Sequence, residues 1–215
     1  MTTKEAPSIA VVPLESGDRL TRAEFERRYA CRPDIKKAEL VEGVVYVASP
    51  VRINRHGAPH ALVIGWLIHY QLSHPDVRVA DNSTVRLDAD NEPQPDAMLF
   101  WDEAHGGQAR ISEDDYLEGA PELVVEVAAS SASYDLHDKM RAYRRSGVRE
   151  YIVWQILENR LDWFRLKDGE YLPVSPGDDG IIESEAFPGL RLHVPSLLAQ
   201  DLAGVLNALD TPDTD

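Results

Sequence analysis

The pattern of apolar and polar positions predicts that the chain starts with a short helix and a hairpin. Residues 20–30 (LTRAEFERRYA) read as a helix, with Thr21 as its N-cap and Glu24 completing a capping box. Residues 36–49 (KKAELVEGVVYVAS) predict two short strands that turn at Glu42-Gly43, because a glycine in this position suits a tight hairpin turn.

The next part of the chain predicts a longer helix followed by extended segments. Residues 56–75 carry apolar side chains at helical spacing and end at Pro75, which cannot continue a helix. Extended segments are expected at residues 77–80, 83–88 and 95–101, the last after a run rich in helix breakers.

Residues 121–143 (PELVVEVAASSASYDLHDKMRAY) predict a buried strand and then a helix. The strand is apolar on both faces, as in a sheet covered on both sides, except for Glu126. A lone ionised carboxylate is costly to bury, so Glu126 must be paired, protonated or bound to a metal. The helix is expected over about residues 135–146, with Ser133 as its cap and Gly147 after its last turn.

The remaining pattern completes a single α/β fold with a mixed sheet, flanked by helices and with a hairpin added at each end. Residues 149–156 read as another buried strand, and KDG at residues 167–169 predicts the second hairpin. We expect one domain over residues 19–200, a flexible N-terminal segment over residues 1–18 and an acidic tail over residues 201–215.

Composition is that of a globular protein, with 43% hydrophobic and 27% charged residues. No apolar stretch is long enough for a membrane span, and the first ten residues lack the apolar core of a signal peptide. The lone cysteine, Cys31, excludes an intramolecular disulfide framework. These features predict a soluble cytoplasmic protein that does not bind membranes.

The net charge of −15 argues against loose, sequence-independent binding of nucleic acid, which depends on Lys and Arg releasing counterions. The charge is uneven, however. Residues 139–149 hold five bases and no acid, and residues 19–37 hold seven bases and three acids. Each run alone is more typical of a solvated helix face, but together they allow a local basic surface.

Two carboxylates and a lysine are the candidates for chemistry. If the strands that carry Asp96 and Glu126 are neighbours, both side chains can converge at one edge. Their repulsion would be relieved by a shared proton or by Mg²⁺, which accepts one or two carboxylates and keeps several waters. Lys139, four residues after Asp135, could point at this site from the following helix, with Asp135 holding its ammonium.

The same residues have a plainer interpretation. Asp135 and Lys139 are spaced as an ordinary helix-surface pair, which stabilises by about 0.2–0.5 kcal/mol. Asp96 after a proline is a common turn residue. Spacing alone leaves both interpretations open.

The ordered set QPDAMLF, PELVVEVAASS and YDLHDKMRAYRRSGVREYIV resembles the bacterial putative restriction endonucleases of the Uma type, a branch of the PD-(D/E)XK nuclease superfamily. The resemblance extends from ELVEG near Glu39 to FPGLRL near residue 190. It implies a restriction-endonuclease-like fold with an αβββαβ core, and hydrolysis of DNA phosphodiester bonds.

The resemblance also implies roles for individual residues. Asp96 and Glu126 would be the metal ligands, for Mg²⁺ or Mn²⁺, with the backbone carbonyl of Val127 as a further ligand. The superfamily's usual lysine stands two residues after the glutamate, where this chain has Ala128. Lys139 matches the place of the lysine in Uma-type proteins, and we expect it to position or activate the attacking water.

Two further residues fall where the family carries side chains near its site, namely Glu39 and His60. His56 and His60 are also spaced as zinc ligands on a helix, but position 57 is Gly57 and not the glutamate of a HExxH motif. No P-loop or dinucleotide-binding glycine pattern is present in the sequence.

We therefore expect a metal-dependent endodeoxyribonuclease with Asp96, Glu126 and Lys139 as catalytic residues. Because cutting both strands usually needs two sites, a homodimer is expected on mechanistic grounds. The alternative is a non-catalytic binding or assembly module with a nuclease fold, which the acidic charge favours.

Overall fold

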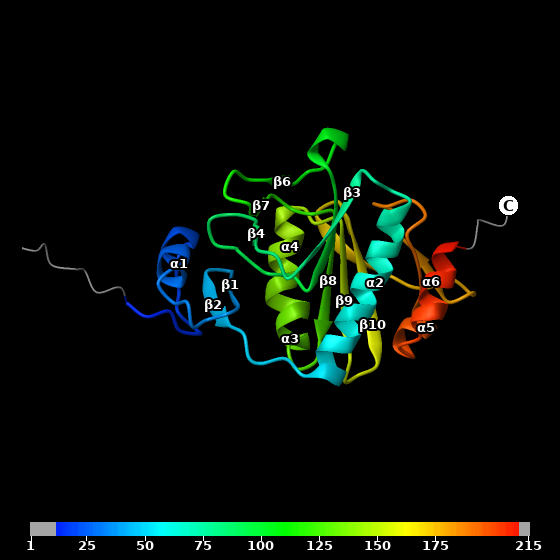
Figure 1. The fold of residues 1–215 in the computed structure, drawn as a ribbon, viewed down its shortest axis with the longest axis horizontal. Helices are drawn as coiled ribbons and strands as arrows, with labels where there is room; N and C mark the ends of the chain where they lie inside the picture. Colours follow the sequence, from blue (N-terminus) through cyan, green and yellow to red (C-terminus); the bar gives the residue numbers. More distant parts are fainter. Residues whose placement is uncertain (1–11, 211–215) are drawn as a thin grey trace, which may run out of the picture.

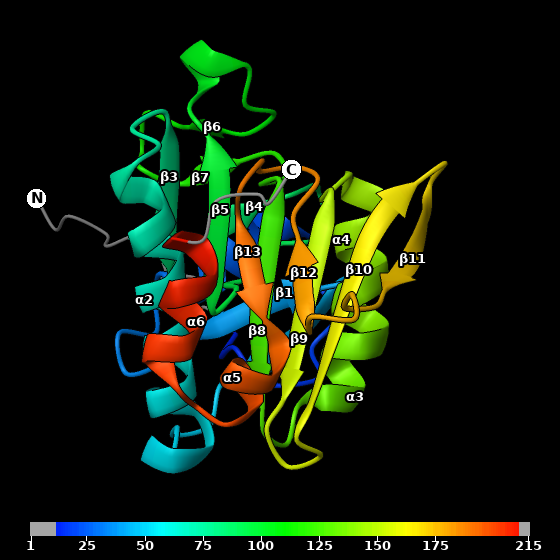
Figure 2. The ribbon, with the colours of Figure 1, turned by 90° about the vertical axis from the view of Figure 1, so that its right-hand side faces the viewer.

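A six-stranded mixed sheet forms the centre of the protein. The computed structural model describes residues 12–210. The strands follow the order β11-β10-β9-β8-β5-β3 across the sheet (Figure 2). Only β8 and β9 are parallel, whereas the other neighbours are antiparallel. The strands are β3 (Val77–Asp81), β5 (Ala97–Trp101), β8 (Leu123–Ala128), β9 (Glu150–Gln155), β10 (Arg160–Lys167) and β11 (Glu170–Val174).

The parallel pair is connected by a helical crossover, as parallel strands require. The crossover is one continuous helix in three parts: α3 (Ala132–Tyr134), the π-helical turn η3 (Asp135–Lys139) and α4 (Met140–Ser146). All residues of β8 and β9 are buried, because both faces of the sheet are covered. The expected α/β fold with a mixed sheet is therefore confirmed.

Helices cover the two faces of the sheet (Figure 1). One face packs against α2 (Ala58–Leu72), the β12–β13 pair (Ile181–Glu183 and Arg191–His193), α5 (Val194–Leu198) and α6 (Leu202–Asp210). The other face packs against α3, η3 and α4. Alternate residues of β8 divide between the two layers, because successive strand side chains point to opposite faces. Val125 and Val127 belong to the α2 layer, and Val124 and Ala128 to the α4 layer.

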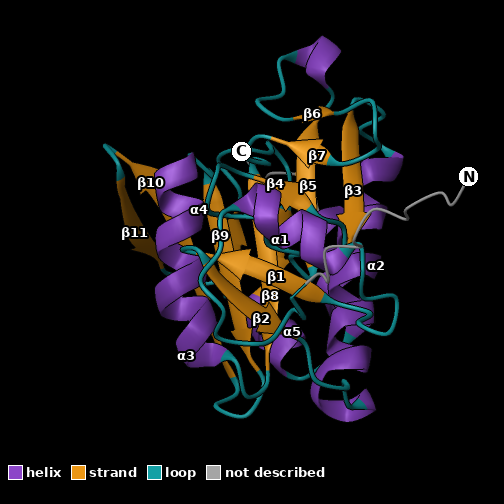
Figure 3. Ribbon diagram, turned by 90° about the vertical axis from the view of Figure 1, so that its left-hand side faces the viewer, coloured by secondary structure: helices purple, strands orange, loops and turns teal. Residues whose placement is uncertain are grey.

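The N-terminal elements lie on the α4 side of the sheet (Figures 1 and 3). They are α1 (Arg22–Tyr29) and the hairpin of β1 (Ala38–Val41) and β2 (Val44–Val47). A short three-stranded sheet joins β4 (Val85–Arg86), β6 (Arg110–Ile111) and β7 (Leu117–Glu118), and the 3₁₀ turn η2 (Glu103–His105) follows β5. The turn of π-helix η1 (Ile53–Gly57) leads into α2.

Both predicted hairpin turns occur at the expected residues. Glu42 and Gly43 adopt positive φ angles of 52° and 71° between β1 and β2. Asp168 and Gly169, at 51° and 81°, connect β10 to β11. Two consecutive positive φ angles match the right-handed twist of the strands that they connect.

Thr21 is the N-cap residue of α1, as predicted, but its side chain makes no capping bond and the predicted capping box does not form. The carboxylate of Glu24 instead accepts hydrogen bonds from Arg27 and Arg28. Charge-assisted bonds to guanidinium groups are stronger than a bond to a backbone N–H, so they take the carboxylate away from the helix start. Ser133 lies inside α3 and does not precede it, because the helix begins three residues earlier than expected.

The boundaries expected for the terminal segments fall partly outside the described residues, since residues 1–11 and 211–215 are not described. Within residues 12–18, Leu14 is buried and the Gly17 N–H donates to the carbonyl oxygen of Val45. Within the expected tail, residues 202–210 form α6, which buries Val205 and Ala208. In the described part of the chain, no helix is long and apolar enough to cross a membrane.

Candidate active site

Glu126 lies in the middle of β8 with its carboxylate directed to the α4 side of the sheet. It shares this face with Val124 and Ala128, because strand side chains alternate. The residue is 2% exposed. Its Oε1 accepts hydrogen bonds from Lys139 Nζ and from the Tyr143 hydroxyl, each at 2.9 Å. The glutamate inside the apolar strand is therefore paired with a lysine of the crossover helix.

Lys139 ends the π-helical turn η3 and is enclosed by carboxylates. Its Nζ lies 2.9 Å from Glu39 Oε1, 2.9 Å from Glu126 Oε1 and 3.8 Å from Asp135 Oδ1. Its side chain is 4% exposed. Burial acts to lower the pKa of Lys139, but the carboxylates of Glu126, Glu39 and Asp135 together raise it well above its ordinary value. The lysine is therefore charged at neutral pH.

Asp96 stands immediately before β5, the strand next to β8 that carries Glu126. Its Oδ2 accepts a hydrogen bond of 2.8 Å from the Val127 backbone N–H and lies 3.1 Å from His56 Nε2. Its Oδ1 lies 3.6 Å from Lys37 Nζ. Burial acts to raise the pKa of Asp96, but His56 and Lys37 lower it well below its usual range. Asp96 is therefore ionised, and its position is fixed by the backbone of β8.

The carboxylates of the site interact with one another through their charges. Burial raises the pKa of Glu126 far above its ordinary value, and Lys139 opposes this shift while the charges of Asp96, Asp135 and Glu39 add to it. Burial likewise raises the pKa of Asp135. A group of four carboxylates is therefore incompletely neutralised by the lysines that contact it.

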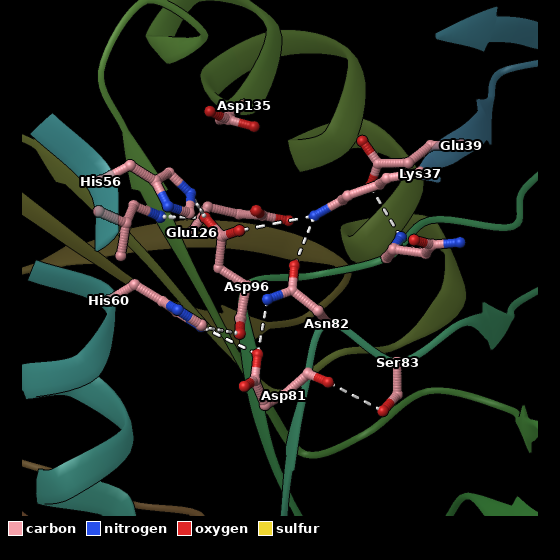
Figure 4. A network of polar contacts seen from close by, with 12 residues as sticks. Lys37, Glu39, His56, His60, Asp81, Asn82, Ser83, Asp96, Glu126 and Asp135 are labelled. Atoms are coloured by element: carbon pink, nitrogen blue, oxygen red, sulfur yellow. Dashed lines mark hydrogen bonds and ion pairs between the residues drawn. The ribbon is translucent and has the colours of Figure 1, made fainter. Parts of the chain in front are cut away.

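An outer ring of polar contacts surrounds Asp96 (Figure 4). His60 Nε2 lies 2.7 Å from the carbonyl oxygen of Asp96 and 3.1 Å from Asp81 Oδ1, so this nitrogen carries the proton that it donates. Lys37 Nζ donates to Asn82 Oδ1 at 2.8 Å, and Asn82 Nδ2 donates to Asp81 Oδ1 at 2.6 Å. The ring connects the end of β3, the start of α2 and the residue before β1.

The structure brings together all of the side chains that the sequence predicted for the site. Asp96, Glu126 and Lys139 form its centre, and Glu39 and Asp135 contact the lysine. His60 contacts the backbone of Asp96 and not its carboxylate. At Val127 the structure shows a contact of the backbone N–H, whereas metal binding by its carbonyl oxygen stays a prediction.

Three contacting residues were not predicted as members of the site: Lys37, His56 and Tyr143. Lys37 precedes Glu39 by two residues in an extended segment, so the alternation of side chains could have placed both on one face. The spacing of His56 and His60 suggested a possible zinc pair, but the two histidines contact different atoms of Asp96, the carboxylate and the backbone carbonyl oxygen. Tyr143 has the spacing of an apolar residue on the crossover helix, so the pattern did not predict the hydrogen bond that its hydroxyl donates to Glu126.

The donor set of the site fits a divalent cation that needs few protein ligands. Within residues 12–210, no three His, Cys, Asp or Glu side chains are arranged so that they could hold a metal ion. Asp96 and Glu126 nevertheless belong to one site, because Asp96 accepts the N–H of Val127, the residue after Glu126, and the charges of the two carboxyl groups interact. Mg²⁺ accepts one or two carboxylates and completes its shell with water and phosphate oxygens, so two protein carboxylates suffice.

Comparison with known proteins identifies related sequences and folds. Residues 22–195 match the model of the Uma2 family, described as putative restriction endonuclease. A similar solved structure is that of a putative nuclease belonging to DUF820 from Anabaena variabilis ATCC 29413. Its TM-score is 0.61 at 12% sequence identity, over 81% of this chain and 97% of that chain. At this identity the structural match shows the fold alone. No curated protein matches the chain.

Proposed function

Because this chain belongs to the Uma2 family of putative restriction endonucleases, we propose that it hydrolyses DNA phosphodiester bonds at the site formed by Asp96, Glu126 and Lys139. The observation that carries the proposal is that Glu126 is paired with the buried, charged Lys139, while the carboxylate of Asp96 is held by the backbone N–H of Val127, the residue after Glu126. Perturbed pKa values from burial and a specific charge partner are typical of functional sites.

The order of elements supports a restriction-endonuclease-like core. Helix α2 is followed by β3, β5 and β8, then by the crossover helix of α3, η3 and α4, and finally by β9. This order agrees with the αβββαβ arrangement expected from the sequence resemblance. The candidate residues come from β8, the crossover helix and the position immediately before β5, which are central parts of that core.

In this proposal Asp96 and Glu126 hold Mg²⁺ or Mn²⁺, with the Val127 carbonyl as a third protein ligand. When bound, the cation lowers the pKa of a coordinated water and neutralises charge on the phosphoryl oxygens. The Val127 N–H holds the Asp96 carboxylate in place, and the Tyr143 hydroxyl does the same for Glu126. Held carboxylates need no rearrangement during the reaction.

Lys139 acts in this proposal through its charge. An ammonium whose pKa is raised cannot serve as a general base at neutral pH. It favours the ionised form of Glu126 against the effect of burial, which raises the pKa of that carboxyl. In this proposal it also orients the attacking water by exchanging its longest contact, the 3.8 Å contact with Asp135, for that water, and it offsets the negative charge that develops during phosphoryl transfer.

Plasmid cleavage in the presence of Mg²⁺ or Mn²⁺ tests the proposal. We expect Glu126→Gln and Asp96→Asn each to lower the rate by about 100-fold or more, since each removes a charged group that acts on the transition state. Glu158→Gln, at an exposed position in the turn after β9, serves as the matched control and should cleave normally. Equal rates for wild type and Glu126→Gln would refute the assignment.

Metal binding can be tested without any substrate. Mg²⁺ or Mn²⁺ should raise the melting temperature of the wild type, because a ligand that binds only the folded state stabilises it. The Glu126→Gln variant should lose this response. If neither protein responds, the non-catalytic binding or assembly module becomes the better proposal. The net charge of −15 and the lack of a three-ligand group in the described residues favour that alternative.

A further inference from the structure

The two lysines of the candidate site differ in their access to solvent. The Lys139 side chain lies between the crossover helix and β8 and is 4% exposed, whereas the Lys37 side chain is 26% exposed. Lys37 stands immediately before β1 and approaches Asp96 from the outer side of the site (Figure 4). A substrate that arrives from solvent therefore meets Lys37 before it can reach Lys139.

The two lysines also differ in how far their donors are occupied. A lysine ammonium has three N–H donors. Those of Lys139 face Glu39, Glu126 and Asp135, at distances between 2.9 and 3.8 Å. Since three carboxylates enclose it, a phosphate anion would have to displace one of them to contact its Nζ. Lys139 is therefore poorly placed to bind a phosphodiester directly.

Lys37 has more N–H donors than close hydrogen-bond partners. Its one short hydrogen bond goes to the neutral amide oxygen of Asn82, at 2.8 Å, and its contact with Asp96 Oδ1 is longer, at 3.6 Å. A cation bound to Asp96 would take over the neutralisation of that carboxylate. The ammonium of Lys37 would then be available to an anion at the same edge of the site, without being left unpaired.

Asn82 holds Lys37 in this position. Asn82 has a positive φ of 47° in the turn after β3, a conformation that asparagine tolerates better than most residues. Its amide nitrogen donates to Asp81, which in turn contacts His60 on α2. Asn82, the one short hydrogen-bond partner of Lys37, is thus itself held by a further side chain, which is the arrangement expected of a preorganised binding group.

We propose that Lys37 is the lysine that binds a phosphate oxygen of the DNA backbone at this site, with Asn82 as its positioning residue and Lys139 as the internal charge partner of the carboxylates. The inference rests on the proposed nuclease function. It assigns phosphate binding to Lys37 and compensation of the carboxylate charges to Lys139. It adds a residue to the site that the sequence motifs do not include.

Binding of a short fluorescein-labelled DNA duplex, measured by anisotropy with Ca²⁺ in place of Mg²⁺, tests the role of Lys37. Each phosphate contact contributes a slope of about −0.9 to a plot of log affinity against log salt. For Lys37→Met, a rise in salt of about fourfold should therefore weaken binding about 3.5-fold less than it does for wild type. Lys37→Arg should restore the wild-type slope, because it restores the charge.

Lys36→Met is the matched control, since Lys36 is the exposed neighbour and donates to the carbonyl oxygen of Pro33. It should keep the wild-type slope. Asn82→Gly preserves the turn conformation but removes the amide, so it should weaken binding at low salt and reduce the slope. Melting temperatures of all variants without metal will show whether each is folded, and Lys37→Arg provides the comparison if Lys37→Met is not.

The possible results separate the two proposals. If the wild type binds and cleaves DNA but Lys37→Met and Lys36→Met give equal slopes, Lys37 does not contact phosphate and the inference is overturned, while the nuclease function stands. If the wild type neither binds the duplex nor cleaves plasmid with Mg²⁺ or Mn²⁺, the proposed function fails, and the role of Lys37 fails with it.

Discussion

At the scale of single residues, the main feature of the site is that ionisable side chains are buried against a sheet. The carboxylate of Glu126 is buried in an apolar strand, and its burial is offset by Lys139 and by the hydroxyl of Tyr143. Ala128, two residues after Glu126 on the same strand, is fully buried and packs against α4. The positive charge therefore reaches Glu126 from the crossover helix and not from β8.

Loss of the Lys139 charge should destabilise the protein strongly. In Lys139→Met, three buried carboxylates would lose their cation, and breaking a buried ion pair costs about 3–5 kcal/mol. The decrease in the free energy of unfolding should be largest at neutral pH. It should become smaller in acid, because protonated carboxyl groups are neutral and do not need the lysine charge. Urea denaturation at several pH values measures it, with exposed Lys167→Met as the control. A loss below about 1 kcal/mol would mean that the carboxylates are neutralised in another way.

Outside the candidate site, Glu92 gives the protein a second pH-sensitive position. Burial, together with the neighbouring carboxyl of Glu26, raises the pKa of Glu92 to about 8, against the opposing effect of Arg86. In the unfolded chain the group titrates near its ordinary value, so the folded state holds more protons between these values. The free energy of unfolding should therefore decrease as the pH rises from about 5 to about 8.

The variant Glu92→Gln should remove this part of the pH dependence, because an amide does not titrate. Melting temperatures of wild type and variant across that pH range measure the difference, with Glu158→Gln as the exposed control. Parallel curves for wild type and Glu92→Gln would show that Glu92 is not the titrating group.

At the scale of elements, two π-helical turns lie beside the candidate site. One of them, η1, brings His56 to Asp96, and the other, η3, carries Asp135 and Lys139. Single π turns within helices are frequent at functional sites, because the extra residue in the turn redirects the side chains. The apolar periodicity predicted a helix from residue 56 and another from about residue 135, but it could not predict the π-helical turns, since they change the direction of individual side chains and not the pattern of burial.

The end of the crossover helix depends on Gly147. This residue follows α4 with a φ of 90°, which side chains rarely adopt, and its added Cβ would meet no other atom within 4 Å. Gly147→Ala should therefore cost about 1 kcal/mol through backbone strain alone. Gly57→Ala is the matched control: its φ is −59°, and it should be neutral or slightly stabilising. Equal stabilities in chemical denaturation would contradict the strained turn.

At the scale of the whole molecule, one sheet is enclosed between two helical layers, and the candidate site residues lie in the α4 layer and immediately before β5. The α2 layer is completed by α6, whose Val205 is fully buried in the larger core. The last part of the chain therefore contributes to the fold through residue 210, beyond the domain limit that the sequence suggested.

Val205→Ala should destabilise the whole protein although it lies far along the chain from the site. Removal of buried methyl groups from a core costs about 1–2 kcal/mol at such a position. The melting temperature should fall by about 2–4 °C for each kcal/mol in a protein of this size. Leu157→Ala, in the exposed turn after β9, should change it little. A wild-type melting temperature for Val205→Ala would show that α6 is not part of the cooperative unit.

Local sequence patterns were enough to predict the order of the main elements, the hairpin turns and the need of Glu126 for a partner. Local rules govern these features: strand and helix periodicity, turn residues with positive φ, and the conflict of Glu126 with its apolar strand. Only the tertiary structure decided which partners resolve that conflict. Lys37, His56 and Tyr143 reach the carboxylates from elements whose periodicity describes burial, and burial patterns do not say which polar atoms meet across layers. Contacts of that kind depend on how the layers pack, so they cannot be derived from any one segment.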